Sequence, residues 1–273
     1  MQKENELFWQ SNFQDTETQL FSTRNEHPYL TAEDVDFEMQ YHKHSDRLQI
    51  TRLSQEGLEH FVQHYAQSYR ILYLYECTHI QDFSPLGKLP GLEAIRIEWC
   101  RGIGQLWDMS QNTSLKVLSI LDAKKLAQNP KLLQTSKTLE EVRIWGSLSG
   151  GTYTMDSLDC FRNMESLRRM DLNWIKLADK SMNVLDTLPN LEEFHFDPGM
   201  LTTEEIAQIV ARYPHLHGDS LRPYDDEYIH IGEVRVCGHR KPTLQLPQQQ
   251  KRLDQYVAQF HALVEKYKAE ETL

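Results

Sequence analysis

The sequence has few cysteines and no long apolar run. Its four cysteines are too far apart to form the short paired spacings of metal or disulfide motifs, so we expect free thiols in a reducing, cytoplasmic compartment. No stretch approaches the roughly 18 apolar residues that a membrane helix needs. The segment from Met1 to Gln19 is polar and acidic and lacks the apolar core of a signal peptide. We therefore expect neither membrane insertion nor secretion.

Positive charge is also scarce. The 29 lysines and arginines are outnumbered by 40 aspartates and glutamates, which gives a net charge of −11 at pH 7 over 273 residues. Nucleic acids and anionic membrane surfaces are negatively charged too, so they are poor candidates for the partner. The balance favours a basic or neutral protein partner, drawn in by long-range electrostatic attraction.

Signatures of catalysis and cofactor binding are missing as well. Gly102-Ile103-Gly104 lacks the third glycine of a nucleotide-binding loop, and Leu148 stands where a nucleophile elbow needs a serine. His42 and His44 could share one face of a strand, but no third metal ligand is spaced nearby. We expect no catalytic residue, no cofactor and no bound metal.

An enzyme is kept only as a minor alternative, with its site in the C-terminal segment. Titratable side chains gather there, although their spacing indicates no reaction: Tyr224, Asp225, Asp226, His230 and His239. The acidic run that continues to Glu227 is interpreted as a solvated turn.

What the sequence does contain is a repeated pattern of apolar residues. An apolar residue is followed by two positions, a second apolar residue, one position and a third apolar residue. Six copies are present: Tyr69/Leu72/Leu74, Leu92/Ile95/Ile97, Leu115/Leu118/Ile120, Leu139/Val142/Ile144, Leu167/Met170/Leu172 and Leu191/Phe194/Phe196. A seventh begins at Leu216, and the starts are 23, 23, 24, 28, 24 and 25 residues apart. A repeat of this length with this core predicts a solenoid of stacked parallel strands.

These residues resemble the leucine-rich repeat superfamily. Its full pattern has Asn or Cys three positions after the third apolar residue, where the first two repeats have Cys77 and Cys100. The segment from Leu72 to Cys100, which includes the run from Leu86 to Glu93, is similar to the repeats of intracellular recognition receptors. The resemblance implies an α/β leucine-rich repeat solenoid with a curved parallel sheet, whose concave face binds proteins. In this register the two cysteines fill a small buried slot.

The pattern divides the chain into three parts. We predict an N-terminal cap at 1–68, six to seven leucine-rich repeats at 69–216 and a C-terminal hairpin-plus-helix cap at 217–273. In the first part, a strand is expected through Leu48 and Ile50, and Ser54 can cap a helix. Between repeats, helices are expected from Asp179 to Leu188 and after the capping box of Thr202 and Glu205. In the third part, Gly232-Glu233 suits a two-residue hairpin, and Pro247 opens an amphipathic helix.

The positions between the apolar residues should point outward and form the binding surface. Trp, Tyr and Arg dominate interface energetics, and exposed tryptophan is costly unless it serves a purpose. The predicted partner-binding residues are Tyr73, Tyr75, Arg96, Glu98, Trp99, Arg143, Trp145, Asn173, Trp174 and His195. The alternative is that the tryptophans only pack against neighbouring repeats. The longer fourth interval, with the segment Ser147 to Thr154, adds a candidate binding loop.

The leading hypothesis is a non-catalytic, monomeric module that binds one protein partner through the concave face. One version is an inhibitor or immunity-type protein that blocks a basic active site. The alternative is a structural or self-associating scaffold.

Overall fold

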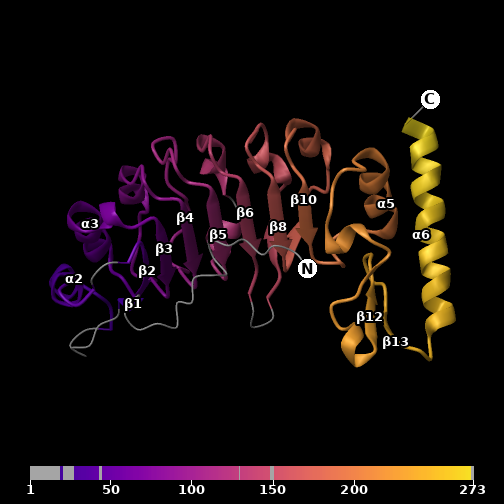
Figure 1. Ribbon diagram of the computed structural model, residues 1–273, viewed down its shortest axis with the longest axis horizontal. Helices are drawn as coiled ribbons and strands as arrows, with labels where there is room; N and C mark the ends of the chain where they lie inside the picture. Colours follow the sequence, from indigo (N-terminus) through magenta and orange to yellow (C-terminus); the bar gives the residue numbers. More distant parts are fainter. Residues whose placement is uncertain (1–18, 21–27, 43–44, 129, 148–150, 272–273) are drawn as a thin grey trace.

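The computed structural model describes residues 19–20, 28–42, 45–128, 130–147 and 151–271. Its main sheet has eight parallel strands that follow one another in chain order (Figure 1). They are β1 (Gln19–Leu20), β2 (Arg47–Thr51), β3 (Ile71–Tyr75), β4 (Ala94–Glu98), β5 (Val117–Leu121), β6 (Glu141–Trp145), β8 (Arg169–Asn173) and β10 (Glu193–Phe196). The predicted α/β class with a parallel sheet is confirmed.

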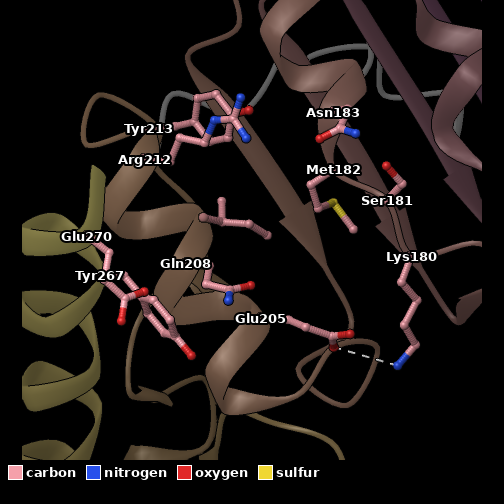
Figure 2. Close-up of a pocket in the computed structure, with 11 residues that line it drawn as sticks. Lys180, Ser181, Met182, Asn183, Glu205, Gln208, Arg212, Tyr213, Tyr267 and Glu270 are labelled. Carbon is pink, nitrogen blue, oxygen red and sulfur yellow. Dashed lines mark ion pairs between the residues drawn. The ribbon is translucent and has the colours of Figure 1, made fainter. Parts of the chain in front are cut away.

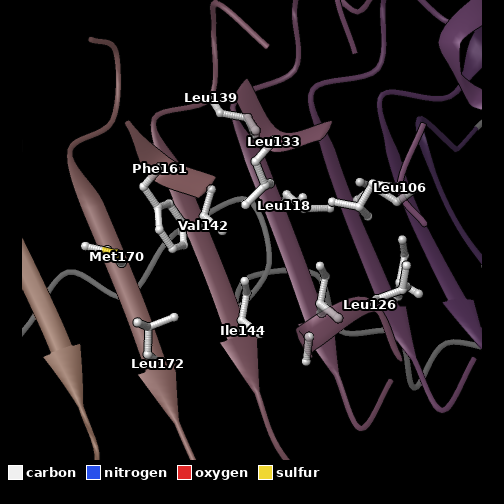
Figure 3. Close-up of a cluster of buried hydrophobic side chains, with 14 of the residues drawn as sticks. Leu106, Leu118, Leu126, Leu133, Leu139, Val142, Ile144, Phe161, Met170 and Leu172 are labelled. Atoms are coloured by element: carbon white, nitrogen blue, oxygen red, sulfur yellow. The ribbon is translucent and has the colours of Figure 1, made fainter. Parts of the chain in front are cut away.

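The apolar pattern sets the register of this sheet. Leu72 pairs with Ile95, which pairs with Leu118, and the row continues through the same position of every later repeat. Because side chains alternate along a strand, this register sends all the pattern leucines to one side. Figure 3 shows Leu118, Val142 and Met170 of neighbouring strands in a row, with Phe161 of a return segment packed nearby. These residues are at most 1% exposed.

The two cysteines of the repeat pattern lie in the buried slot that the sequence predicts. Cys77 and Cys100 are both 0% exposed. The Cys77 thiol lies 3.4 Å from the Tyr75 carbonyl oxygen, and the Cys100 thiol lies 3.5 Å from that of Glu98. The hydrogen bond with Cys77 is the largest cause that raises the pKa of Cys100, and burial raises it further.

The parallel array begins before Tyr69. The strand expected through Leu48 and Ile50 is β2, and it pairs with β3 in the same register, Leu48 with Leu72. The pattern is hidden in the sequence because Ser45 stands where the later repeats have their first apolar residue. Ser54 caps α3 (Gln55–His64) as predicted, and the preceding helix is α2 (Ala32–Met39).

The return segments are mostly 3-10 turns. They are Ser84–Lys88, Lys131–Thr135, Leu158–Phe161 and Asn183–Thr187, and one short helix, α4 (Lys124–Gln128), precedes the second. The helix predicted from Asp179 to Leu188 is confirmed only in part, as the shorter 3-10 helix Asn183–Thr187. Its apolar residues Met182, Leu185 and Leu188 recur every third position, which matches the 3.0 residues per turn of a 3-10 helix. The capping box of Thr202 and Glu205 does begin a helix, α5 (Thr203–Arg212).

The insertion of the fourth interval builds a second, smaller sheet. β7 (Tyr153–Met155) pairs in parallel with β9 (Ile175–Leu177). The buried carboxylate of Asp122 holds this segment by accepting hydrogen bonds from the Tyr153 hydroxyl and, at 3.1 Å, from that of Ser147. Of the candidate binding loop from Ser147 to Thr154, residues 148–150 lie outside the described residues, as does His44 of the histidine pair.

The C-terminal segment forms an antiparallel sheet and a long helix. The sheet consists of β11 (Tyr224–Asp225), β12 (Glu233–Val236) and β13 (Thr243–Gln245), and the helix is α6 (Gln250–Glu271). Figure 1 shows α6 standing beside α5 at the end of the molecule opposite α2 and α3. Phe260 and Val264 are the buried residues of α6 that join the main core.

The hairpin predicted at Gly232-Glu233 is wrong. Ile229–Ile231 is a 3-10 turn, and Gly232 closes it in the left-handed conformation, with φ of 82°. A glycine before a strand suits either a hairpin or such a closing turn, so the sequence did not distinguish them. β12 instead pairs with β11 and with β13, which follows a turn at Gly238–Lys241.

Candidate functional site

The side of the main sheet opposite the pattern leucines, here called the strand face, has the register that the sequence predicts. Its central row runs through Tyr73, Arg96, Ser119, Arg143, Asp171 and His195. Eight of the ten predicted residues lie on strands at strand-face positions. The other two, Trp99 and Trp174, are the first residues after β4 and β8.

Both of these tryptophans have a left-handed backbone, with φ of 56° for Trp99 and 53° for Trp174. Arg52, Glu76 and Asp122 share this conformation at the equivalent positions of other repeats. The amide of Trp99 donates to the Leu121 carbonyl at 3.1 Å, so the left-handed residue still extends the hydrogen bonding between strands. A bulky residue here costs about 1–3 kcal/mol, which the surrounding repeat must offset.

The first part of the strand face carries a group that we call the tyrosine cluster: Tyr73, Tyr75, Arg96, Glu98 and Trp99. The Glu98 carboxylate accepts a hydrogen bond from the Tyr73 hydroxyl and pairs with the Arg96 guanidinium at 2.6 Å. That guanidinium lies 4.7 Å above the Tyr73 ring, and the Tyr75 ring lies 5.2 Å from that of Trp99. Tyr73 is 8% exposed and Glu98 5%, and burial raises the pKa of Tyr73.

The second part carries the aspartate cluster: Arg143, Trp145, Asp171, Asn173 and Trp174. One oxygen of the buried Asp171 carboxylate accepts from the Trp145 indole at 2.9 Å and from the Asn173 amide at 2.8 Å. The other pairs with Arg143 Nε at 3.2 Å, and burial lowers the pKa of this arginine. Trp174 meets the Trp145 ring edge to face at 5.8 Å and is 37% exposed.

The repeat pattern places Asp171, which lies between Met170 and Leu172, on the strand face. It was not among the predicted binding residues, although its carboxylate holds Arg143, Trp145 and Asn173 together. The sequence did contain a signal for this role. In the predicted register Asp171 lies opposite Arg143 of the neighbouring strand, where the two opposite charges can pair. Opposite charges at facing positions of neighbouring strands stabilise one another.

His195 joins the strand face to the C-terminal segment. Its Nε2 lies 3.0 Å from a Glu193 oxygen, and its Nδ1 lies 3.5 Å from an Asp219 oxygen. Burial alone would lower the pKa of His195, but the hydrogen bonds to Asp219 and Glu193 outweigh it, and the pKa is raised. The Ser220 hydroxyl adds a second link by donating to the Phe196 carbonyl.

A cavity of about 430 Å³ lies between the aspartate cluster and the C-terminal segment. Four predicted residues line it: Arg143, Trp145, Asn173 and His195. The opposite wall is acidic, with Asp219, Asp225, Asp226 and Glu227 around Arg222. The acidic run interpreted from sequence as a solvated turn therefore forms a wall of this cavity. Residues 219–227 are distant in the sequence from β6 and β8, so no local pattern predicts that they line the same cavity.

The tyrosine cluster does not line this cavity. β5 separates the two clusters and presents Val117, Ser119 and Leu121, each of which is at most 5% exposed. The predicted residues thus form two groups on one face. A different cavity, of about 460 Å³, touches the tyrosine cluster only through Trp99, beside Arg52 and Arg101.

Another cavity, of about 440 Å³, lies on the return side of the molecule. Figure 2 shows it between the segment from Lys180 to Asn183, helix α5 and the end of α6. An ion pair of 3.7 Å between Lys180 and Glu205 spans it. It contains none of the predicted binding residues.

The residues named for the catalytic alternative are not all brought together in one site. Asp225 and Asp226 line the cavity beside the aspartate cluster, whereas His230 is exposed elsewhere and His239 binds the Gly199 carbonyl oxygen at 3.2 Å. Within the described ranges, no three His, Cys, Asp or Glu side chains are grouped to hold a metal ion. Among the helices in those same ranges, none is long and apolar enough to cross a membrane.

No protein-family model and no curated protein matches the chain. Similar solved structures include internalin C2 of Listeria monocytogenes, which is 18% identical with a TM-score of 0.36 over 59% of this chain and 82% of that chain. TLR13, in its complex with ssRNA13, is 11% identical with a TM-score of 0.41 over 70% of this chain and 30% of that chain. Internalin F of Listeria monocytogenes is 13% identical with a TM-score of 0.26, over 68% and 66%.

The leucine-rich repeat resemblance rests on the repeats of the chain itself and not on these structures. The chain's own repeats and their strand register define the fold.

Proposed function

We propose that this chain is a non-catalytic, cytoplasmic leucine-rich repeat module that binds one protein partner through the strand face. In this proposal the repeats form a solenoid whose first strands, β1 and β2, lie within the predicted N-terminal cap at 1–68, and residues 217–273 cover the other end. The observation that carries the proposal is the cavity beside the aspartate cluster. Four side chains selected from sequence as partner-binding line a single opening there, together with an acidic wall.

The chemistry of this opening suits a protein surface. Trp145 offers a large ring that its neighbours hold in place, and Trp174 at the end of β8 is 37% exposed. Aromatic and arginine side chains that are positioned before binding lose little conformational entropy on association. Trp145, Arg143 and Trp174 are therefore the proposed anchors of the interface.

Charge favours a basic partner. The chain carries a net charge of −11, and the cavity wall formed by residues 219–227 is itself acidic. Complementary charge raises association rates and rejects partners of like charge. A narrower form of the proposal is an inhibitor or immunity-type role, in which the acidic opening covers the basic active site of an enzyme.

The test is affinity capture from a lysate of the source organism. The bait is the full chain, compared with Trp145→Ala/Trp174→Ala and with the control Tyr41→Ala, which changes a 67% exposed ring on a distant surface. We expect one stoichiometric partner that the double variant loses and the control retains. Thermal melts of all three baits show whether the variants remain folded.

Equal capture by the wild type and a folded double variant would contradict the proposal. If the double variant unfolds, Trp174→Ala alone is used, because this ring is the more exposed of the pair.

A further inference from the structure

An exposed apolar patch directly follows the acidic wall of the cavity. It consists of Tyr228, Ile229 and Ile231, which are 51%, 51% and 60% exposed. Isolated exposed apolar residues are ordinary, but a contiguous group beside a cavity marks an interaction surface. The acidic wall spans residues 219–227, which include β11, and the patch follows it in the turn that leads to β12.

The backbone of this segment does not need apolar side chains. The amide of Ile229 donates to the Asp226 carbonyl at 3.1 Å, and that of Gly232 donates to the Ile229 carbonyl at 3.0 Å. These backbone bonds close the turn whatever side chains it carries. Polar residues would serve the fold equally well here, so the apolar side chains favour contact with something outside the chain.

The acidic wall has more negative charge than its own arginine can balance. Arg222 Nη2 lies 3.1 Å from an Asp219 oxygen and 3.0 Å from an Asp226 oxygen. Asp225 and Glu227 line the same cavity, so four carboxylates face one guanidinium on this wall. On the opposite wall, Arg143 is already paired with Asp171, Arg169 with Glu193, and His195 with Glu193 and Asp219.

We propose that the cavity and the apolar patch together form one docking site for a basic, amphipathic segment of a protein partner. A lysine or arginine of that segment enters the cavity between the acidic wall and the Trp145 ring. A neighbouring apolar side chain of the segment covers Ile229 and Ile231. This inference rests on the proposed function and specifies which chemistry the partner presents.

Charge argues against a second copy of the chain as the occupant. Two copies that met through this site would bring two acidic walls together, each on a chain of net charge −11. Like charges brought together at an interface oppose association. A basic segment relieves that charge instead.

The experiment measures the binding of a labelled six-residue peptide, in which arginine alternates with leucine, by fluorescence anisotropy with the full chain. Two comparison peptides replace arginine with glutamate, or leucine with glycine. The charge variant is Asp225→Asn/Glu227→Gln, which leaves the Asp226–Arg222 pair intact. In it the asparagine can still accept the hydrogen bond that Asp225 receives from the Glu227 amide at 2.9 Å. The apolar variant is Ile229→Ser/Ile231→Ser.

A charge-matched control is Glu56→Gln/Glu204→Gln, on exposed positions of α3 and α5 that do not line the cavity. We expect the arginine–leucine peptide to bind the wild type and the control equally. The charge variant and the apolar variant should each weaken binding at least tenfold. Both comparison peptides should also bind the wild type at least tenfold more weakly.

The proposal is overturned if the wild type does not bind the arginine–leucine peptide, or if either site variant binds it as tightly as the wild type. Equal binding of the glutamate–leucine peptide would also overturn it. Sedimentation that shows a wild-type dimer, lost in Ile229→Ser/Ile231→Ser, would assign the patch to self-association instead.

Affinity capture separates failure of this inference from failure of the proposed function. A partner lost with Trp145→Ala/Trp174→Ala but retained by both site variants leaves the function standing and removes the docking site. A partner retained by the folded tryptophan variant removes the function itself.

Discussion

The tyrosine cluster and the aspartate cluster use the same chemistry in different surroundings. Each has a buried carboxylate, an arginine paired with it and an aromatic hydrogen-bond donor. In the tyrosine cluster, Tyr73 fills the space beside the arginine and is itself buried. In the aspartate cluster, the same face opens into a cavity of about 430 Å³. Aromatic residues on the strand face therefore do not by themselves mark a binding site.

The two clusters differ in whether the C-terminal segment lies beside them, and it lies beside the aspartate cluster. Residues 219–227 of the C-terminal segment line the cavity and contact β10 through His195 and Ser220. Among the described residues, two buried side-chain nitrogens of the tyrosine cluster, Arg96 Nε and Trp99 Nε1, have no hydrogen-bond partner, whereas the aspartate cluster has no such atom. Because the cavity beside the C-terminal segment is lined by the aspartate cluster and not by the tyrosine cluster, we expect the first cluster to serve stability and the second to serve both stability and binding.

The largest expected effect is the loss of either buried carboxylate. Asp171→Ala leaves Arg143, whose side chain is 14% exposed, without its counter-ion, and we expect a loss of about 3–5 kcal/mol in the free energy of unfolding. Glu98→Ala should cost less, because Arg96 is 25% exposed and can reach water. Urea unfolding of both variants measures the comparison. A larger loss for Glu98→Ala would show that the tyrosine cluster is the more tightly constrained of the two.

Removing one aromatic hydrogen bond from each cluster should separate stability from binding. Tyr73→Phe and Trp145→Phe each delete a donor to a buried carboxylate, which costs about 1.5–3 kcal/mol for a hydrogen bond to a charged group. Only Trp145→Phe should also weaken capture of the partner, because Trp145 lines the cavity and Tyr73 does not. Unfolding curves and affinity capture are run on the same preparations. Weaker capture by a folded Tyr73→Phe would extend the binding surface across β5.

A smaller effect is the pH dependence that His195 gives to the second cluster. Its pKa is raised in the folded chain, so its contribution to stability is fully present below the ordinary histidine value of about 6.5. The contribution is lost as the pH rises through the raised folded pKa. The charged groups around the ring are Glu193, Asp219, Asp171 and Arg169.

The check compares thermal melts of the wild type and His195→Gln from pH 5 to pH 9. The difference in stability should be largest at the acidic end and shrink as the pH rises through neutrality. His60 also contacts a carboxylate, that of Asp36 at 2.7 Å, so His60→Gln serves as a matched substitution outside the cavity. A difference that grows with pH would mean that His195 is held in its neutral form.

The register of the strand face could be predicted from the sequence because it depends on a local pattern. Leucines at fixed spacing alternate with outward positions, and this alone placed Arg143 and Asp171 in one row. The composition of the second cavity wall was not predictable in the same way. Asp219 reaches His195 across 24 residues, and no periodic pattern connects them. The turn at Gly232 was missed for a different reason, since two backbone geometries suit the same glycine.

The smallest expected effect concerns the two left-handed tryptophans. Glycine adopts the left-handed conformation without a steric cost, so Trp174→Gly removes strain while it removes a ring that is 37% exposed. We expect its free energy of unfolding to change by less than about 1 kcal/mol, with a clear loss of partner capture.

Trp99→Gly relieves the same strain but also removes a ring that is only partly exposed and stacks on Tyr75 at 5.2 Å. It should be the less stable variant of the two, by about 1–2 kcal/mol in urea unfolding, and should leave capture unchanged. Because both substitutions make the same change at equivalent positions of the repeat, a reversed order of stability would assign the structural role to the aspartate cluster and the open surface to the tyrosine cluster.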